Sequence, residues 1–100
     1  MIFAFDHDAR REVAEAAAYY AARASSAGED FEAEFQAALE RIKDRPNAWP
    51  PILKSPGFRR CLLSRFPYQL IYRVEGELIR VYAVAHHKQR PGYWKKRVPR

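Results

Sequence analysis

A change in the spacing of apolar residues, near the middle of the chain, constrains the fold more than any other feature. From Val13 to Ile42 apolar side chains recur every three or four residues, as on one face of a helix. From Phe58 to Ala85 they alternate, as along β-strands. The segment Pro46 to Gly57 separates the two patterns and contains four prolines, which cannot continue a helix. The sequence therefore predicts a helical half and a sheet half joined by a loop.

The helical half reads as a short strand followed by two helices. Residues 2–5 are apolar, and Asp6 or Asp8 can accept the free N–H groups that begin a helix. The first predicted helix is rich in alanine, and Ser25 to Gly28 interrupt it. The second has an apolar stripe at Phe31, Phe35, Ala38, Leu39 and Ile42. The short break favours an antiparallel helical hairpin that packs on a sheet.

The sheet half predicts three strands, near Phe58 to Ser64, Tyr68 to Val74 and Leu78 to Ala85. If Glu75-Gly76 is a two-residue hairpin turn, Val74 pairs with Glu77 and Tyr72 with Ile79. Alternation then places one set of side chains against the helices: Leu70, Tyr72, Val74, Ile79, Val81 and Ala83. The other set forms an open face, which we expect to be the working surface: Gln69, Ile71, Arg73, Arg80, Tyr82, Val84 and His86.

The length of 100 residues predicts a single domain spanning residues 1–100. Cys61 is the only cysteine, so no internal disulfide can form and a cytoplasmic location is expected. No stretch approaches the roughly 20 apolar residues that span a bilayer, so no membrane partner is expected. The acidic residues of the helical half are interpreted as solvated helix faces.

Positive charge is concentrated in the sheet half. Residues 1–50 contain six Lys/Arg and ten Asp/Glu, whereas residues 51–100 contain twelve and two. Such asymmetry indicates a polyanionic partner, either nucleic acid or an acidic polypeptide. Arginines are interleaved with tyrosines here, a mixture that suits unpaired bases and phosphates, although the same residues also serve as strand formers and solvated edges.

His86 and His87 directly follow the last predicted strand, with Arg90 and Tyr93 just beyond. An imidazole and a phenol beside a phosphodiester could act as acid and base in RNA cleavage, while an arginine stabilises the developing charge. Adjacent histidines at a strand end are also compatible with a structural or solvent-exposed role. No phosphate loop, hydrolase triad or metal-ligand set is visible, so no cofactor and no metal are predicted.

The segments RRCLLSRFPYQLIYRV and AVAHHKQRPGYW resemble the RelE/ParE superfamily of toxins from bacterial toxin–antitoxin modules, as do AAAYY and RPNAWPP. The resemblance is strongest to ParE-like, or plasmid stabilisation, toxins. It implies an α+β fold of order β-α-α-β-β-β, in which a helical hairpin packs on a mainly antiparallel sheet. The N-terminal strand would lie beside the last one, and a short C-terminal helix or tail would follow.

The resemblance implies a type II toxin that inhibits growth, by ParE-like poisoning of DNA gyrase or by RelE-like cleavage of ribosome-bound mRNA. A cognate antitoxin with an acidic or amphipathic segment would neutralise it in a hetero-oligomer. A non-toxic nucleic-acid-binding regulator is a further alternative. The Pro-rich RPNAWPPILKSPG replaces the lysine-rich loop of some RelE-like enzymes, a departure from the ribonuclease pattern.

The candidate site residues follow from both arguments. Those expected to be catalytic, if the chain is a ribonuclease, are Arg65, His86, Arg90 and Tyr93. Those expected to contact nucleic acid or another target are Lys54, Arg59, Arg60, Arg73, Arg80, Tyr82, His87, Lys88 and Trp94.

Overall fold

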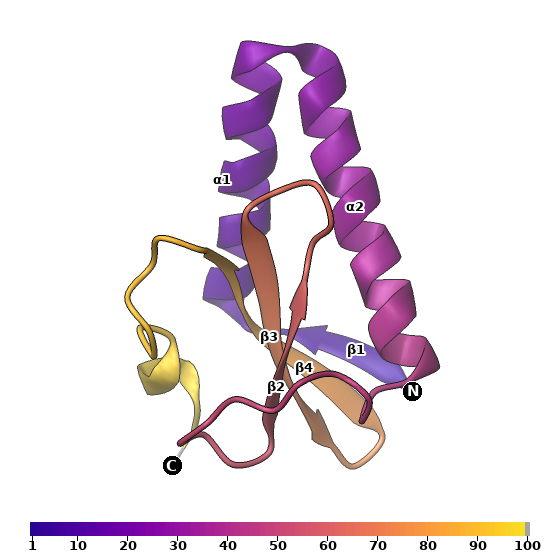
Figure 1. Ribbon diagram of the computed structural model, residues 1–100, viewed down its shortest axis with the longest axis vertical. Coiled ribbons are helices and arrows are strands. Elements are labelled where there is room, and N and C mark those ends of the chain that lie inside the picture. Colours follow the sequence, from indigo (N-terminus) through magenta and orange to yellow (C-terminus); the bar gives the residue numbers. More distant parts are fainter. Residues whose placement is uncertain (100) are drawn as a thin grey trace.

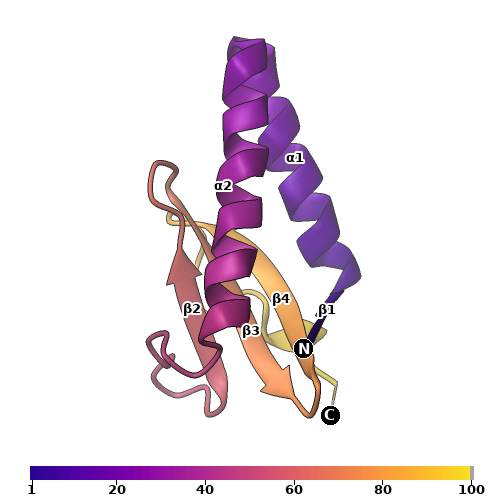
Figure 2. The same cartoon turned by 90° about the vertical axis from the view of Figure 1, so that its right-hand side faces the viewer.

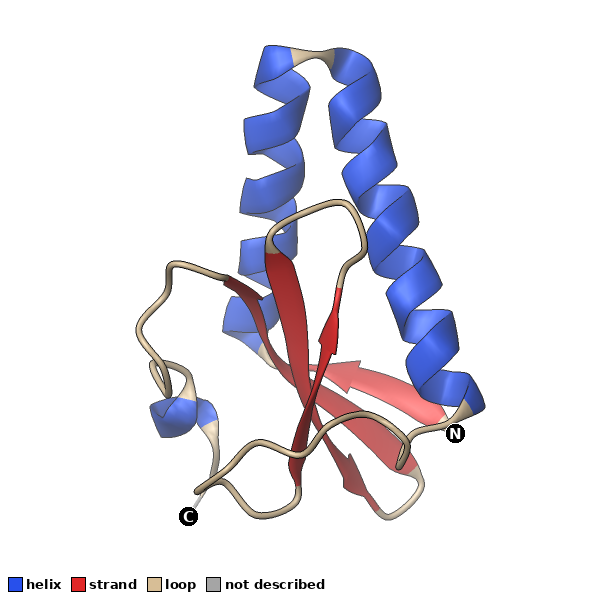
Figure 3. Cartoon of the chain, viewed as in Figure 1, coloured by secondary structure: helices blue, strands red, loops and turns tan. Residues whose placement is uncertain are grey.

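A computed structural model describes residues 1–99 of the chain (Figure 1). Along the chain lie β1 (Ile2–Phe5), α1 (His7–Arg23), α2 (Ser25–Asp44), β2 (Phe58–Leu62), β3 (Tyr68–Glu75), β4 (Leu78–His86) and a short 3₁₀ helix, η1 (Lys95–Arg97). This order confirms the predicted α+β architecture, including the short C-terminal helix. Figure 3 shows the two long helices in blue beside the strands of the sheet in red.

The four strands form one sheet in the order β1-β4-β3-β2. β1 pairs with β4 in parallel, and the other two neighbouring pairs are antiparallel. The N-terminal strand therefore lies beside the last one, as predicted. Figure 2 shows that the tip of the helical hairpin extends beyond the ends of the strands.

The helices meet without the predicted four-residue break. Asp6 caps α1, its carboxylate accepting the Asp8 N–H at 2.9 Å, and only Ala24 departs from helical geometry before α2 begins. The prediction that Ser25 to Gly28 interrupt the helices is wrong, because these residues form the first turn of α2. Gly28 lies against α1, where a Cβ atom would come within 2.8 Å of the Ala21 Cβ. The glycine thus allows close helix contact instead of ending a helix.

The predicted register of the β3–β4 hairpin is wrong: the loop lies one residue further along the chain, and the β3 residues next to it pair two residues further along β4 than predicted. Glu75 pairs with Leu78 and Val74 with Ile79, so Gly76 and Glu77 form the loop. Gly76 has a φ of +62°, and glycine at the first loop position is the requirement of a type II′ hairpin turn.

A β-bulge at Tyr82 changes which side chains share a face. Tyr72 pairs with Val81 but Ile71 pairs with Ala83, so β4 has one residue more than β3 at this point. Beyond the bulge the alternation is reversed relative to the prediction. Val84 therefore packs in the core beneath the helices, whereas Ala83 lies on the opposite face.

Both faces of the sheet are covered. The helices cover the larger core, in which Phe31, Ile42, Leu70 and Val81 are buried. On the other face a second cluster consists of Phe58, Ile71, Tyr82, Ala83, Ala85 and Trp94, with Ile52, Tyr93 and Val98 packed against it. The prediction of a wholly open working face is therefore wrong, because the loop after α2 and the C-terminal segment fold back over it.

Candidate functional site

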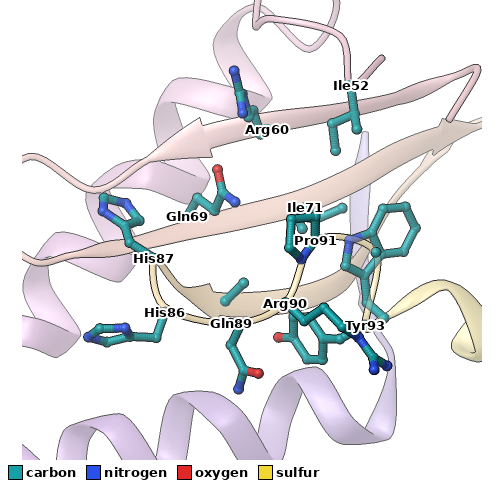
Figure 4. Close-up of a pocket in the computed structure, with 13 residues that line it drawn as sticks. Ile52, Arg60, Gln69, Ile71, His86, His87, Gln89, Arg90, Pro91 and Tyr93 are labelled. Atoms are coloured by element: carbon teal, nitrogen blue, oxygen red, sulfur yellow. The ribbon is translucent and has the colours of Figure 1, made fainter. Parts of the chain in front are cut away.

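A pocket of about 190 Å³ lies where β2, β3 and the end of β4 meet the C-terminal segment (Figure 4). Six of the predicted site residues line it: Arg60, His86, His87, Arg90, Tyr93 and Trp94. Of the other lining residues, strand alternation places Gln69 and Ile71 on the predicted working face. Sequence reasoning assigned no role to the rest: Ile52, Ala85, Gln89, Pro91 and Gly92.

Two backbone N–H groups anchor the segment that follows β4. The His87 N–H donates to the Pro67 carbonyl at 2.8 Å, and the Lys88 N–H donates to Nδ1 of His86 at 3.0 Å. An imidazole that accepts at Nδ1 carries its proton on Nε2 when neutral. The His86 ring lies edge-on to Tyr68, with centroids 5.0 Å apart. Because of the bulge, His86 is therefore not grouped with Arg73, Arg80 and Tyr82 as predicted.

Two aromatic residues of the pocket are fixed by structural contacts. The Tyr93 hydroxyl donates to Oε2 of Glu12 at 2.6 Å, and burial together with this hydrogen bond raises the pKa of the phenol. Trp94 is buried against Phe58, with ring centroids 4.8 Å apart. Trp94 thus belongs to the second core, and its ring is not available as the surface contact that the sequence suggested.

Glu12 is the centre of a network that sequence reasoning missed. Its carboxylate accepts hydrogen bonds from the Arg97 guanidinium at 2.9 and 3.0 Å and from the Val84 N–H at 3.0 Å. The Glu12 and Arg97 side chains are only 10% and 11% exposed. Reading Glu12 as part of a solvated helix face is therefore wrong. No local pattern reveals its role, since its partners follow it by more than 70 residues.

A second network holds three predicted target contacts. Glu75 accepts hydrogen bonds from Arg73 at 2.8 Å, Arg80 at 3.0 Å and the Tyr82 hydroxyl at 2.6 Å. Burial alone would raise the pKa of Glu75, but the hydrogen bonds outweigh it and lower the pKa from 4.5 to about 2. Both arginines are thus bonded to one carboxylate within the protein, which balances one of their two positive charges.

The remaining predicted residues lie outside the pocket. Arg65 follows β2 and is 3.7 Å from the Glu34 carboxylate on α2, and Arg59 donates to the Trp49 carbonyl at 2.7 Å. Lys54 occupies a loop with a φ of +67°. Lys88 is exposed beside the pocket. The structure therefore does not bring the four predicted catalytic residues together, because Arg65 does not line the pocket that holds the other three.

An apolar groove of about 370 Å³ lies between β1, α1 and α2. Phe3, Phe5, Val13, Phe35 and Leu39 line its floor, and Arg10 and Glu32 lie beside them. β1 is an edge strand, so the groove borders backbone groups that face no further strand of the sheet.

Within residues 1–99, no helix combines the length and apolarity needed to cross a bilayer. The same residues contain no cluster of three or more His, Cys, Asp or Glu side chains that could hold a metal ion.

Comparison with known proteins identifies the family. Residues 3–91 match the family described as "ParE toxin of type II toxin-antitoxin system, parDE". A solved structure titled "Chromosomal ParDE TA system from P. aeruginosa" contains a chain of similar fold, with a TM-score of 0.64 and 19% identity over 86% of this chain and 95% of that one. No curated protein matches. Because the family match covers most of the sequence, the chain belongs to the ParE toxin family of type II toxin–antitoxin systems.

Proposed function

We propose that this chain inhibits growth by poisoning DNA gyrase through binding, without catalysing a reaction of its own. The main support is that the Tyr93 side chain is already hydrogen-bonded within the protein. Its hydroxyl donates to Glu12 and its pKa is raised, so the phenol is poorly suited to act as an acid or base near neutral pH. Arg65 faces Glu34 and not the pocket. A surface that lacks an assembled catalytic set suits a binding toxin better than a ribonuclease.

The gyrase proposal can be tested with purified components. Gyrase, supercoiled DNA and the chain are mixed, and cleaved DNA is measured after protein removal. We expect cleaved DNA to accumulate with the dose of the chain. If inhibited cells show neither DNA breaks nor a DNA damage response, and purified gyrase is unaffected, the proposal is wrong.

Ribosome-dependent mRNA cleavage is the alternative, and the pocket itself favours it. His86, His87, Arg60 and Arg90 surround one cavity, and imidazole and guanidinium groups can support phosphodiester cleavage. This mechanism predicts fragments of ribosome-bound mRNA on induction and their loss in His86→Ala. Full toxicity of that variant, with intact mRNA, would exclude it.

We further propose that the groove beside β1 receives the apolar side of a cognate antitoxin segment. Its floor is apolar, and the adjacent edge strand can accept an added strand. Ala14 lines the groove and is exposed, so Ala14→Arg should block it without disturbing the core. Ala18 is exposed on the same helix but does not line the groove, which makes Ala18→Arg the matched control.

The product of the neighbouring gene, coexpressed with the chain, provides the test. We expect Ala14→Arg to weaken the complex at least about tenfold, the effect of losing about 1.4 kcal/mol of binding free energy, while Ala18→Arg retains it. If both variants retain the antitoxin equally well, the antitoxin binds elsewhere on the toxin.

A further inference from the structure

Three cationic or potentially cationic side chains at the pocket have no partner within the described chain. These side chains are Arg60, His87 and Arg90. All three are exposed, and within residues 1–99 none of them forms a side-chain hydrogen bond or ion pair. Elsewhere on the same sheet face, Arg73 and Arg80 are held by Glu75. The rim of the pocket therefore carries two arginines whose side-chain donors are not used within the described chain.

The lining of the pocket indicates the charge of its ligand. None of its thirteen lining residues is acidic, so an anion would meet no repelling carboxylate. Figure 4 shows Arg60 on the β2 side and Arg90 on the opposite side, in the segment after β4. Arginines separated in this way can contact successive phosphates of one strand, because each guanidinium can bind a phosphate with two hydrogen bonds.

The floor of the pocket narrows the choice of ligand. The half-buried Ile52 contributes most of the floor's apolar surface, while Ile71 and Ala85 lie almost completely buried beneath. A bare anion would leave that surface in contact with water, whereas an unpaired nucleotide brings a flat base together with its phosphate. The volume of about 190 Å³ is below the roughly 300 Å³ at which ordinary small-molecule sites begin. It therefore suits a single base, with the phosphates at the rim.

We propose that this pocket binds one unpaired nucleotide of a DNA strand, with Arg60 and Arg90 on its phosphates and the base on the apolar floor. His87 would supply a further donor at the rim. The assignment to DNA rests on the proposed function, since a toxin that acts on gyrase meets the strand that gyrase opens.

The first test uses the purified chain alone. Binding of fluorescent pentathymidylate is measured by anisotropy in about 50 mM salt, where phosphate contacts are strong. We expect Arg60→Gln and Arg90→Gln each to weaken binding about tenfold, as expected for loss of a hydrogen bond to a charged group. Arg45→Gln removes the same charge from an exposed position outside the pocket and should change binding less than about twofold.

The same assay tests the role of the base. A pentamer with the same phosphates but abasic sugars should bind about tenfold more weakly, because it brings no base to the apolar floor. Equal losses in all three arginine variants would show that general surface charge binds the strand, and equal binding of the abasic strand would remove the base from the site. Tighter binding of pentauridylate would overturn the assignment to DNA.

A second measurement separates this inference from the proposed function. Arg60→Gln and Arg90→Gln should also reduce gyrase-dependent DNA cleavage about tenfold, in parallel with oligonucleotide binding. If the wild-type chain binds pentathymidylate through the pocket but does not affect gyrase, the nucleotide site stands and the gyrase proposal fails. If the variants lose gyrase inhibition while the wild-type chain binds no oligonucleotide, the pocket contacts gyrase protein and the nucleotide site is wrong.

Discussion

Arg97 and Glu12 form a buried ion pair that joins the C-terminal segment to the first helix. The pair has two hydrogen bonds, of 2.9 and 3.0 Å. Arg97 also donates to the Tyr82 carbonyl at 3.0 Å, while Glu12 accepts the Val84 N–H. β1 pairs with β4 only as far as Val81. The ion pair therefore provides hydrogen-bond partners for the Tyr82 carbonyl and the Val84 N–H of β4, which a longer β1 would otherwise have bonded.

Arg97→Met should destabilise the protein by about 3 kcal/mol, because it leaves the Glu12 carboxylate buried without its cation. Urea unfolding at pH 7, followed by circular dichroism, measures the change. The control is Lys96→Met, at an exposed neighbouring position, with an expected effect within about 0.5 kcal/mol. Adding Glu12→Gln to Arg97→Met should recover part of the loss, and strictly additive losses would contradict the proposed coupling.

Glu75 should make the stability depend on pH. Its pKa is 4.5 in the unfolded reference and about 2 in the folded protein, so its contribution is fully present above about pH 4.5 and is lost as pH falls towards 2. At pH 7, Glu75→Gln should cost about 1–2 kcal/mol, given a carboxylate that is partly exposed. The difference between wild type and variant should shrink as pH approaches 2.

The control for this pH dependence is Glu77→Gln, one loop position beyond Gly76. Glu77 is exposed and its side chain has no hydrogen bond or ion pair within residues 1–99. Its replacement should leave the pH profile of unfolding unchanged. A constant difference between wild type and Glu75→Gln from pH 7 to pH 2 would contradict the network.

Gly28→Ala should destabilise the helical hairpin although alanine favours helices. The new Cβ would lie 2.8 Å from the Ala21 Cβ and 3.1 Å from the Ala17 carbonyl oxygen, and neither atom can move independently of the α1 backbone. Overpacking costs about 1–3 kcal/mol, against a gain in helix propensity of about 1 kcal/mol. Thermal unfolding should show a Tm lower by about 4–8 °C. Ser26→Ala, at an exposed position nearby, should not lower it, and an unchanged Tm in Gly28→Ala would mean that the helices can separate freely.

Much of the fold is predictable because it depends on local patterns. The apolar stripe from Phe31 to Ile42 predicts α2, and alternation from Phe58 onward predicts three strands that the structure confirms. The bulge at Tyr82 escapes prediction because it arises from pairing between strands, which alternation along one strand does not record. That single extra residue moves His86 away from the predicted group.

The sequence predicts where basic residues gather, but not which of them lack partners inside the protein. Sequence reasoning placed Arg60 and His87 among the target contacts and Arg90 among the catalytic candidates, and all three line one pocket. It could not distinguish Arg60 and Arg90 from Arg73 or Arg80, which have the same charge but share an internal partner. Pairing with Glu75 or Glu12 depends on the tertiary fold, so composition alone overestimates the number of available cations.

Cys61 should react with thiol reagents only when the protein opens. The side chain is fully buried between the sheet and the helices, and burial raises the pKa of the thiol, so little thiolate forms and none is accessible. We expect labelling by iodoacetamide to be at least about 10³-fold slower than in urea-unfolded protein, in line with ordinary domain stabilities. Leu62→Cys in a Cys61→Ala background provides the control, because Leu62 is 48% exposed and its replacement should react without unfolding. Rapid labelling of native Cys61 would show that β2 separates readily from the helices.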